Sequence, residues 1–233
     1  MSKAFDTCLV LKAKNVNHVQ LARVFAQIAH VNQKRKFSDE PYIQHLDEVA
    51  YHISKGSSVK DYMFQEYRGV MYDAAYLHDT LEDTDVTKEE IEILFGKECA
   101  DIVVMLTDVS KPKDGNRAIR KALDRAHLAN ANAVAKAIKF ADLLSNLRAI
   151  PKSEPFYTVF KEEAKLLLPV LKTPCPENAI HVKRSGQKEF PEKLVTILEE
   201  MLNGTFVSPL PKGCSLCSVW GGACFWCDMR YPY

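Results

Sequence analysis

The sequence predicts an all-α fold of about eight to ten helices, followed by an irregular, cysteine-rich tail. Apolar residues recur at steps of three and four through roughly the first 200 positions, which is the period of an amphipathic helix. We find no alternating pattern typical of strands, no internal repeat and no heptad array. The chain has 233 residues, 47% of them hydrophobic, which is enough to bury a core without disulfide or metal staples.

The first expected helix covers residues 19–31, where Leu21 and Ile28 lie on one apolar face. The second begins after Pro41 and ends at Gly56, since glycine is a common helix stop. Each of these two helices has a face that can pack against the rest of the domain.

The middle of the chain predicts three more helices. A long helix is expected over about 59–82. A short one begins at Thr87, whose capping box with Glu90 marks a helix start, and ends at Gly96. Residues 97–106 are assigned to a further helix because their neighbours are helical, although their run of β-branched residues would also suit a strand.

Residues 108–115 combine Pro, Gly and Asp and are expected to form a loop. Helices then follow over about 116–130, 133–150, 157–171 and 191–202. Pro169 is expected to kink or shorten the third of these four helices. The helical period stops near Gly204, so we divide the chain into a domain, 1–203, and a tail, 204–233.

The tail holds four of the seven cysteines as two CxxC pairs: Cys214, Cys217, Cys224 and Cys227. Four thiolates could wrap one zinc ion, but the gap between the pairs is shorter than in most zinc sites. A disordered extension, or a segment that docks its aromatic residues on a partner, fits equally well. We therefore assign the tail no metal.

Composition excludes several classes of function. Thirty-one Lys and Arg against 30 Asp and Glu give a net charge of +1, which does not support binding of long nucleic acid. No run of 18 apolar residues exists, so we expect no membrane span. The other three cysteines are scattered, which predicts a cytoplasmic protein and not a secreted disulfide framework. The sequence gives no indication of oligomeric state.

The stretch AAYLHDTLEDT carries the most chemistry. His78 and Asp79 follow an apolar helical face, and Glu82 projects one turn later, with Asp83 next to it. Acidic groups beside a buried apolar face are costly unless something positive compensates them, and a metal ion is the obvious candidate. The alternative is that His78 caps a helix and the acids form a solvated face.

Two further residues strengthen the metal interpretation. His45 lies early in the second helix, and Asp142 lies within an otherwise apolar helix, where an unpaired carboxylate is destabilising. A salt bridge from Asp142 to Lys139 or Arg148 would explain its position without a metal. Two imidazoles and two carboxylates suit Mn²⁺, Fe²⁺ or Zn²⁺ better than Ca²⁺, and leave positions open for water and substrate.

The order of these residues resembles the HD superfamily of metal-dependent phosphohydrolases. The segments EPYIQH, LHDTLEDT, LFGKECADIVVMLTDVSK and KFADLLSNLRAI are similar to the hydrolase domain of RelA/SpoT proteins, and in particular to stand-alone small alarmone hydrolases of the metazoan SpoT homologue type. The resemblance covers about residues 17–172, and no part of the chain is left for a synthetase domain.

The resemblance implies a helical enzyme that removes pyrophosphate from the 3′ position of ppGpp and pppGpp, the alarmones of the stringent response, usually with Mn²⁺. It places His45, His78, Asp79 and Asp142 at the ligand positions. It places Glu82 and Asp83 at the positions of the acidic pair that orients or deprotonates the attacking water. This chemistry suits a cation, which lowers the pKa of water and neutralises phosphoryl charge.

A small, strongly anionic nucleotide as substrate requires basic residues near the site. The resemblance maps Arg35 and Lys36 to a basic pair at the nucleotide, and Asn146 to a nucleotide contact. Lys111, Arg117, Arg120 and Lys121 add a basic loop and helix, of which Arg117, Arg120 and Lys121 share one helix at three- and four-residue spacing. A run of charges is also what an ordinary solvated face looks like.

The chain departs from the family pattern at several positions. LADRLHNMR or LADKLYNLR of the family becomes FADLLSNLR, so a basic residue is lost at Leu143 and a ring at Ser145, and one extra residue separates Arg35 from His45. These changes leave base and phosphate specificity open. Two alternatives are therefore kept: a phosphohydrolase acting on an adenine alarmone or NADPH, and a catalytically quiet binding protein. Retention of Glu82 and Asp83 argues against the second.

Overall fold

The computed structural model describes residues 1–56, 68–173 and 192–205, and within them the chain is helical. An isolated antiparallel bridge joins Lys34 to Pro41 in the loop before α3. The described helices are α1 Lys3–Ala13, α2 His18–Ala29, α3 Ile43–Gly56, α5 Arg68–Leu77, α6 Thr80–Asp83, α7 Lys88–Phe95, α8 Lys97–Leu106, the 3-10 turn η1 Pro112–Asp114, α9 Arg117–Ala129, α10 Ala133–Ala149, α11 Pro155–Lys172 and α13 Glu192–Asn203.

The predicted all-α class is confirmed, and local signals placed most helix ends correctly. α8 has the predicted bounds. The capping box is present at the start of α7, where Glu90 accepts from the Thr87 backbone and donates its own N–H to the Thr87 side chain. Gly96 ends α7 with φ of 89°, a conformation that favours glycine.

Three details of the helices differ from the prediction. The long helix expected over 59–82 is interrupted, since α5 ends at Leu77 and α6 starts at Thr80; its first part lies outside the described residues. α11 continues to Lys172 despite Pro169, which sits in its last turn. α1 was missed, although Ser2 caps it by accepting from the Phe5 N–H.

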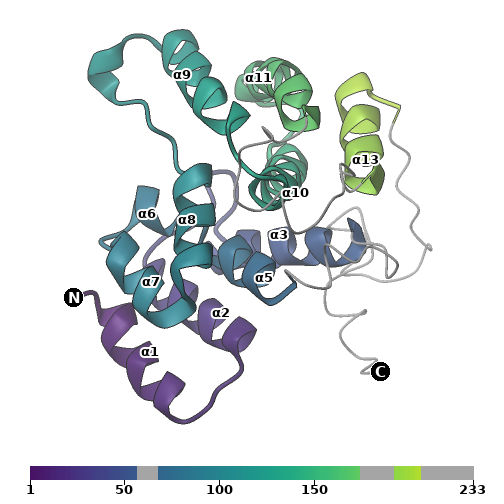
Figure 1. Cartoon of the computed structure of the whole chain (residues 1–233). Helices are drawn as coiled ribbons and strands as arrows, with labels where there is room; N and C mark the ends of the chain where they lie inside the picture. Colours follow the sequence, from purple (N-terminus) through teal and green to yellow (C-terminus); the bar gives the residue numbers. More distant parts are fainter. Residues whose placement is uncertain (57–67, 174–191, 206–233) are drawn as a thin grey trace, which may run out of the picture.

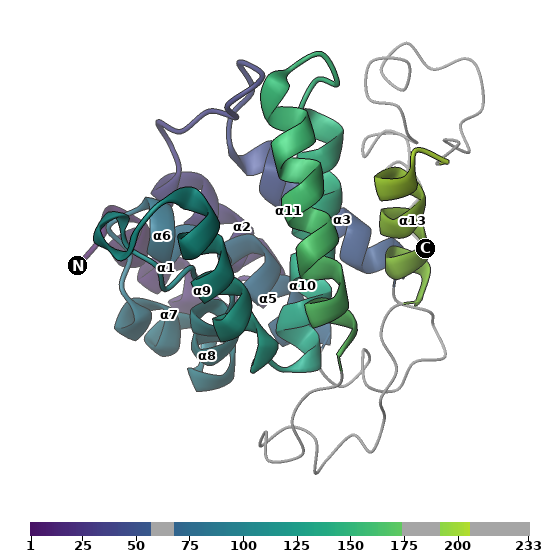
Figure 2. The same ribbon diagram turned by 90° about the horizontal axis from the view of Figure 1, so that it is seen from above.

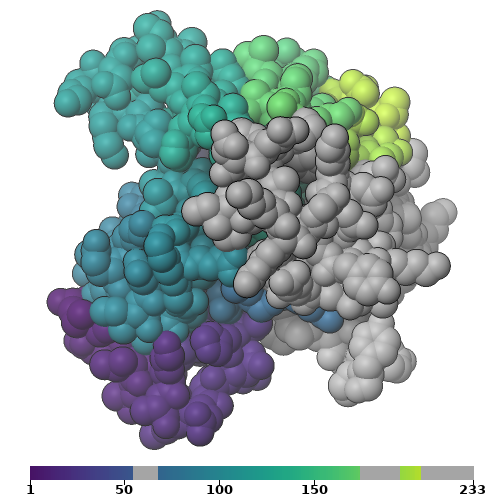
Figure 3. Space-filling model, viewed as in Figure 1, coloured from purple at the N-terminus to yellow at the C-terminus, as the bar shows by residue number. Residues whose placement is uncertain are grey.

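The helices form two groups on either side of α10 and α3. α10 packs against α3, α5 and α8 on one side and against α11 and α13 on the other. Figure 1 shows α1, α2, α7 and α8 below and α9, α11 and α13 above, and the view from above shows α11 lying along α10 (Figure 2). On the face shown in Figure 3, the surface is hollowed between α9 and the α6–α8 side.

The core runs continuously through both groups and accounts for the position of α10. Twelve of its 17 residues are buried, among them Phe140, Ala141 and Leu144. Burial on this scale stabilises the fold by roughly 1.5–3 kcal/mol for each large side chain. Asp142 and Ser145 are buried on the same helix, and they point to the site described below. Among the described residues, none of the helices is long and apolar enough to cross a membrane.

Candidate metal centre and adjoining cleft

The break between α5 and α6 places two polar groups at one point. His78 and Asp79 occupy the two residues between the helices, and Asp79 has an αR backbone that turns the chain into α6. His78 is buried and its Nδ1 contacts the backbone oxygen of Ala75 at 2.8 Å. The turn therefore directs the other nitrogen of His78, Nε2, away from its own helix.

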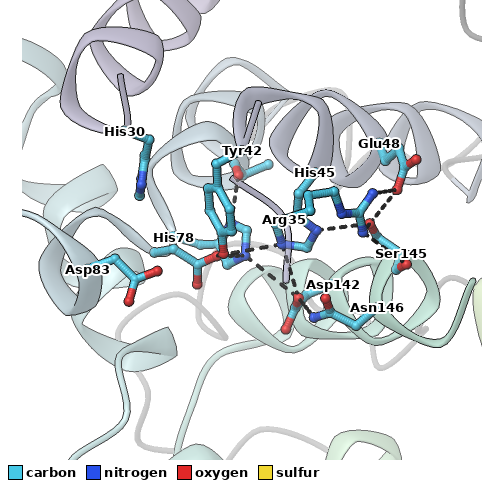
Figure 4. Close-up of polar contacts among 12 residues, drawn as sticks. His30, Arg35, Tyr42, His45, Glu48, His78, Asp83, Asp142, Ser145 and Asn146 are labelled. Atoms are coloured by element: carbon cyan, nitrogen blue, oxygen red, sulfur yellow. Dashed lines mark hydrogen bonds and ion pairs between the residues drawn. The ribbon is translucent and has the colours of Figure 1, made fainter. Parts of the chain in front are cut away.

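Four side chains from three parts of the chain converge there, and Figure 4 shows His45, His78 and Asp142 among them. His78 Nε2 lies 3.1 Å from Asp79 Oδ2 and 3.8 Å from Asp142 Oδ1. His45 Nε2, from α3, lies 3.5 Å from Asp79 Oδ2 and 3.3 Å from Asp142 Oδ1. Ligand atoms of His45, His78 and Asp79 all lie within 4.8 Å of one another, so these three can hold a metal ion. Asp142 approaches both histidines from α10.

The donor and acceptor chemistry of this cluster fits a divalent cation. His78 Nε2 is buried without a hydrogen-bond partner in the described structure. The Nδ1 atoms of both histidines are engaged elsewhere, His78 with a carbonyl and His45 with the Ser145 hydroxyl. If each Nδ1 carries the proton, the two Nε2 lone pairs face carboxylate oxygens, and all of these groups are acceptors. A cation satisfies such a set, and its usual ligands are imidazole and carboxylate.

Electrostatics in the cluster follow from the close charges. Without a metal, burial lowers the pKa of His78, but the Asp79 charge and the contacts of the ring with the accepting oxygens of Asp79 and Asp142 outweigh it and raise the pKa to about 10. Burial likewise raises the pKa of Asp79, yet His78 and His45 hold it well below its usual range. In the absence of a metal the site therefore keeps its carboxylates ionised, as metal ligands must be.

Asp142 divides its two oxygens between different partners. Oδ2 pairs with Lys139 at 2.7 Å, which is the salt bridge expected from the sequence as the alternative to a metal. Oδ1 faces the histidines and accepts from the Asn146 amide at 2.6 Å. The two interpretations are compatible in this geometry, because the lysine holds one oxygen while the other stays directed at the cluster.

Glu82 and Asp83 lie on α6, at the edge of the same cavity. Glu82 Oε1 accepts from the Asp108 N–H at 2.7 Å, and Asp83 Oδ2 accepts from the Gln33 amide at 2.8 Å. Loss of hydration raises the pKa of Glu82 to about 7. The positive charge of Lys139 and the Asp108 N–H lower this pKa, and the negative charge of the Asp108 carboxylate raises it. A carboxylate with a pKa near neutrality is suited to accept a proton.

A cleft of about 370 Å³ extends from the His/Asp cluster towards α9 and α11. Lys36, Arg117 and Lys121 line it, as expected from the sequence. Lys36 Nζ lies 4.9 Å from the centre of the Phe156 ring, and the Arg117 guanidinium lies 5.1 Å from the same centre. Phe37 stacks on Phe156 at 6.1 Å, so this end of the cleft combines cations with flat aromatic faces.

The other expected substrate-binding residues differ in their positions. Arg35 also lines the cleft, but it is only 7% exposed and its guanidinium is held by Glu48 and Ser145. Lys111 and Arg120 lie outside the set of described residues that lines the cleft. Asn146 lines it, but its amide donates to Asp142.

Sequence reasoning did not assign several polar residues to the site. The Tyr42 hydroxyl donates to Asp79 Oδ2, and its ring packs on His30 at 4.9 Å. Lys139, expected only as a salt-bridge partner of Asp142, lines the cleft, and so does Arg125. Tyr42 lies three residues before His45, and Lys139 lies one turn before Asp142. These spacings are the signal that could have found them, because residues one turn apart share a helix face.

Comparisons with known proteins agree with this geometry. The family model described as HD domain matches residues 22–165. The guanosine-3′,5′-bis(diphosphate) 3′-pyrophosphohydrolase MESH1 of Xenopus tropicalis is 36% identical over 151 residues, which are 64% of this chain and 74% of that protein. The human protein of the same name is 35% identical over 132 residues, 56% of this chain and 68% of its own length.

A solved structure shares the fold. It is described by the words "A metazoan ortholog of SpoT hydrolyzes ppGpp and plays a role in starvation responses". The similarity covers 82% of this chain and 98% of that one, with a TM-score of 0.60 and 25% sequence identity.

Proposed function

This chain belongs to the HD domain family, and from that premise we propose that it is a metal-dependent hydrolase that releases pyrophosphate from the 3′ position of ppGpp. The observation that carries the proposal is the convergence of two histidines and two carboxylates in a cleft that also presents Glu82, Asp83 and several cations. Its named relatives are pyrophosphohydrolases of this nucleotide.

His45, His78, Asp79 and Asp142 would hold the cation, with Mn²⁺ as the expected metal. Support comes from the mixed N and O donor set, which suits first-row transition metals better than Ca²⁺. When bound, a divalent cation lowers the pKa of water and neutralises charge on phosphoryl oxygens. Lys139 and the Tyr42 hydroxyl each hold one carboxylate of the set in its orientation.

Glu82 and Asp83 would position the attacking water and take its proton. The water oxygen bonds to the phosphorus that carries the ribose 3′ oxygen, and the bond from that phosphorus to the 3′ oxygen breaks. The 3′ oxygen takes up a proton to become a hydroxyl, and the products are GDP and pyrophosphate. No covalent enzyme intermediate is needed, because the carboxylates act on the water. Both carboxylates are held by backbone or amide donors at one oxygen, which leaves the other oxygen of each for the water.

The far end of the cleft suits a nucleotide. Lys36, Arg117 and Lys121 supply positive charge, and the stacked rings of Phe37 and Phe156 offer flat faces to a base. Arg117 is already paired with Glu163 through two hydrogen bonds, of 2.6 and 2.8 Å. This pairing fixes the guanidinium at the mouth of the cleft, where an incoming diphosphate would meet it.

Product analysis tests the proposal. The full chain is incubated with Mn²⁺ and, separately, with ppGpp, ppApp and NADPH in ¹⁸O-labelled water, and the products are resolved. We expect ppGpp to yield GDP and pyrophosphate, with the label in pyrophosphate. Release of orthophosphate from NADPH alone would keep the chemistry and replace the substrate. Absence of turnover on all three, with Mn²⁺ bound, would contradict the proposal and favour a binding protein.

Two further expectations stay proposals. The division into a domain, 1–203, and a tail, 204–233, rests on the sequence pattern, since residues 206–233 and the four clustered cysteines lie outside the described part of the chain. The cytoplasmic location is supported by the free thiols of Cys8 and Cys99, both buried in the core.

A further inference from the structure

We propose that Ser145 is a positioning residue that sets the tautomer of the metal ligand His45, through a buried relay of Glu48, Ser145 and Arg35. This inference rests on the proposed metal site, but not on the identity of the nucleotide. Ser145 stands where the sequence departs from the family pattern by the loss of a ring. It is completely buried on α10, 100 residues along the chain from its partner.

The hydrogen bonds of the Ser145 hydroxyl can be assigned without ambiguity. Its oxygen lies 2.5 Å from Glu48 Oε2, 3.1 Å from Arg35 Nη2 and 2.9 Å from His45 Nδ1. A carboxylate only accepts and a guanidinium only donates. The single hydroxyl proton therefore goes to Glu48, and the oxygen accepts from Arg35. Towards His45 the hydroxyl can only accept.

The consequence for His45 is a fixed tautomer. Because Ser145 accepts, Nδ1 of His45 must carry a proton, and in the neutral ring the lone pair is then on Nε2. That atom is the one that faces Asp79 and Asp142 in the cluster. A metal ligand histidine is commonly oriented in this way by a partner on its other nitrogen. Here the partner is the neutral Ser145 hydroxyl, which accepts from His45 because its own proton is donated to the Glu48 carboxylate.

Arg35 and Glu48 make the relay directional. Arg35 Nη1 donates to Glu48 Oε2 at 2.8 Å, and Nη2 also reaches the Ser145 backbone oxygen at 3.3 Å. The guanidinium thus contacts both the Glu48 carboxylate and Ser145 (Figure 4). These contacts explain why Arg35 is only 7% exposed although it lines the cleft. Its expected contact with the nucleotide stays a prediction.

The test is a direct measurement of Mn²⁺ affinity by calorimetry. Ser145→Ala removes the acceptor, and we expect the dissociation constant to rise about 10- to 100-fold. Glu48→Leu is similar in size but removes the acceptor shared by Ser145 and Arg35, so the hydroxyl proton is free to point towards His45. That favours the wrong tautomer, so we expect a similar loss. Ser145→Thr keeps the hydroxyl and should restore most of the affinity.

Controls separate this role from general packing. Ile138→Val removes one methylene from the same buried helix and should leave the Mn²⁺ affinity unchanged. In Zn²⁺-loaded protein with ¹⁵N-labelled histidine, we expect a proton on Nδ1 of His45 in wild type, and a weakened or altered signal in Glu48→Leu. If Ser145→Ala fails to fold, Glu48→Leu carries the test, because the Glu48 side chain is partly exposed.

Wild-type Mn²⁺ affinity in both Ser145→Ala and Glu48→Leu would overturn the inference. Failure of the proposed function gives a different result: Mn²⁺ binds and responds to these substitutions, yet ppGpp is not hydrolysed.

Discussion

The Nε2 atom of His45 lies 3.3 Å from the Oδ1 atom of Asp142, and this contact joins α3 to α10 inside the protein. The two residues are 97 positions apart in the sequence. When His45 is neutral and carries its proton on Nδ1, both atoms are acceptors that a cation can satisfy; without a metal, the nearby carboxylates raise the pKa of His45 against the effect of burial. The fold therefore preorganises these two ligand atoms for metal binding.

Metal binding should therefore stabilise the fold. At a Mn²⁺ concentration 100 times the dissociation constant, the gain is about 2.7 kcal/mol, which differential scanning calorimetry detects as a higher Tm. Asp142→Ala should remove this shift. Asp101→Ala removes a surface carboxylate that pairs with Lys88 and Lys97, and it should keep the shift. An equal Mn²⁺ response in both variants would contradict the assigned ligand.

The acidic pair should affect turnover more than binding. Glu82→Gln removes a carboxylate from the cleft without changing its shape, so we expect kcat to fall about 10²- to 10⁴-fold with little change in KM. Mn²⁺ affinity should stay within a few fold, since Glu82 is not among the proposed ligands. Steady-state kinetics with parallel calorimetry separates the two effects. A variant with full kcat would exclude Glu82 as the proton acceptor.

Cations in the cleft should affect substrate affinity. Lys36 lines the cleft, and its loss removes a charged contact of about 1.5–3 kcal/mol, so Lys36→Met should raise KM by about 10- to 100-fold. Lys111→Met is the matched control, because Lys111 lies outside the cleft lining and its substitution should not change KM. The difference between the two should shrink at high salt. Equal effects would mean that only net charge matters.

Asp73 should make the fold less stable as the pH rises. It is 3% exposed, one carboxylate oxygen has no partner in the described structure, and burial raises its pKa to about 7 from an ordinary value of 3.8. Between about pH 4 and pH 7 the native state therefore keeps a proton that the unfolded chain has lost. Stability falls through that window, by at most about 4 kcal/mol.

Asp73→Asn removes the ionisation and should raise stability at pH 8 while changing it little at pH 4. Urea unfolding at both pH values measures the difference. A stability change that is the same at pH 4 and pH 8 would show that Asp73 does not titrate in this range.

Local features of the fold were predictable from the sequence. α8 and the Thr87 capping box depend on residues within a few positions of each other, so periodicity and cap chemistry were sufficient. The interruption at His78 and Asp79 was not predicted, because an apolar period continues across it. The site there is held by contacts with α3 and α10, which short-range patterns do not report.

The metal-ligand positions of the candidate site were predictable from the sequence, but the contacts between its distant segments were not. The ligand positions followed from residue types and a family resemblance, and the structure brings all four together. Arg35 was expected at the nucleotide and does line the cleft, but its pairing with Glu48 and Ser145 was not predicted, because it depends on how the loop before α3 meets α10. The contacts of Ser145 and Tyr42 with the ligands could not be read from the sequence, since a single hydroxyl acquires its role from its neighbours in space.

The most direct test of the account is pyrophosphate release from ppGpp in the presence of Mn²⁺, measured side by side for wild type and Asp142→Ala. We expect wild type to form GDP and pyrophosphate in equal amounts, and the variant, although folded, to be slower by at least about 10²-fold. A wild-type protein that binds Mn²⁺ but releases no pyrophosphate, or a variant that keeps the wild-type rate, would contradict it.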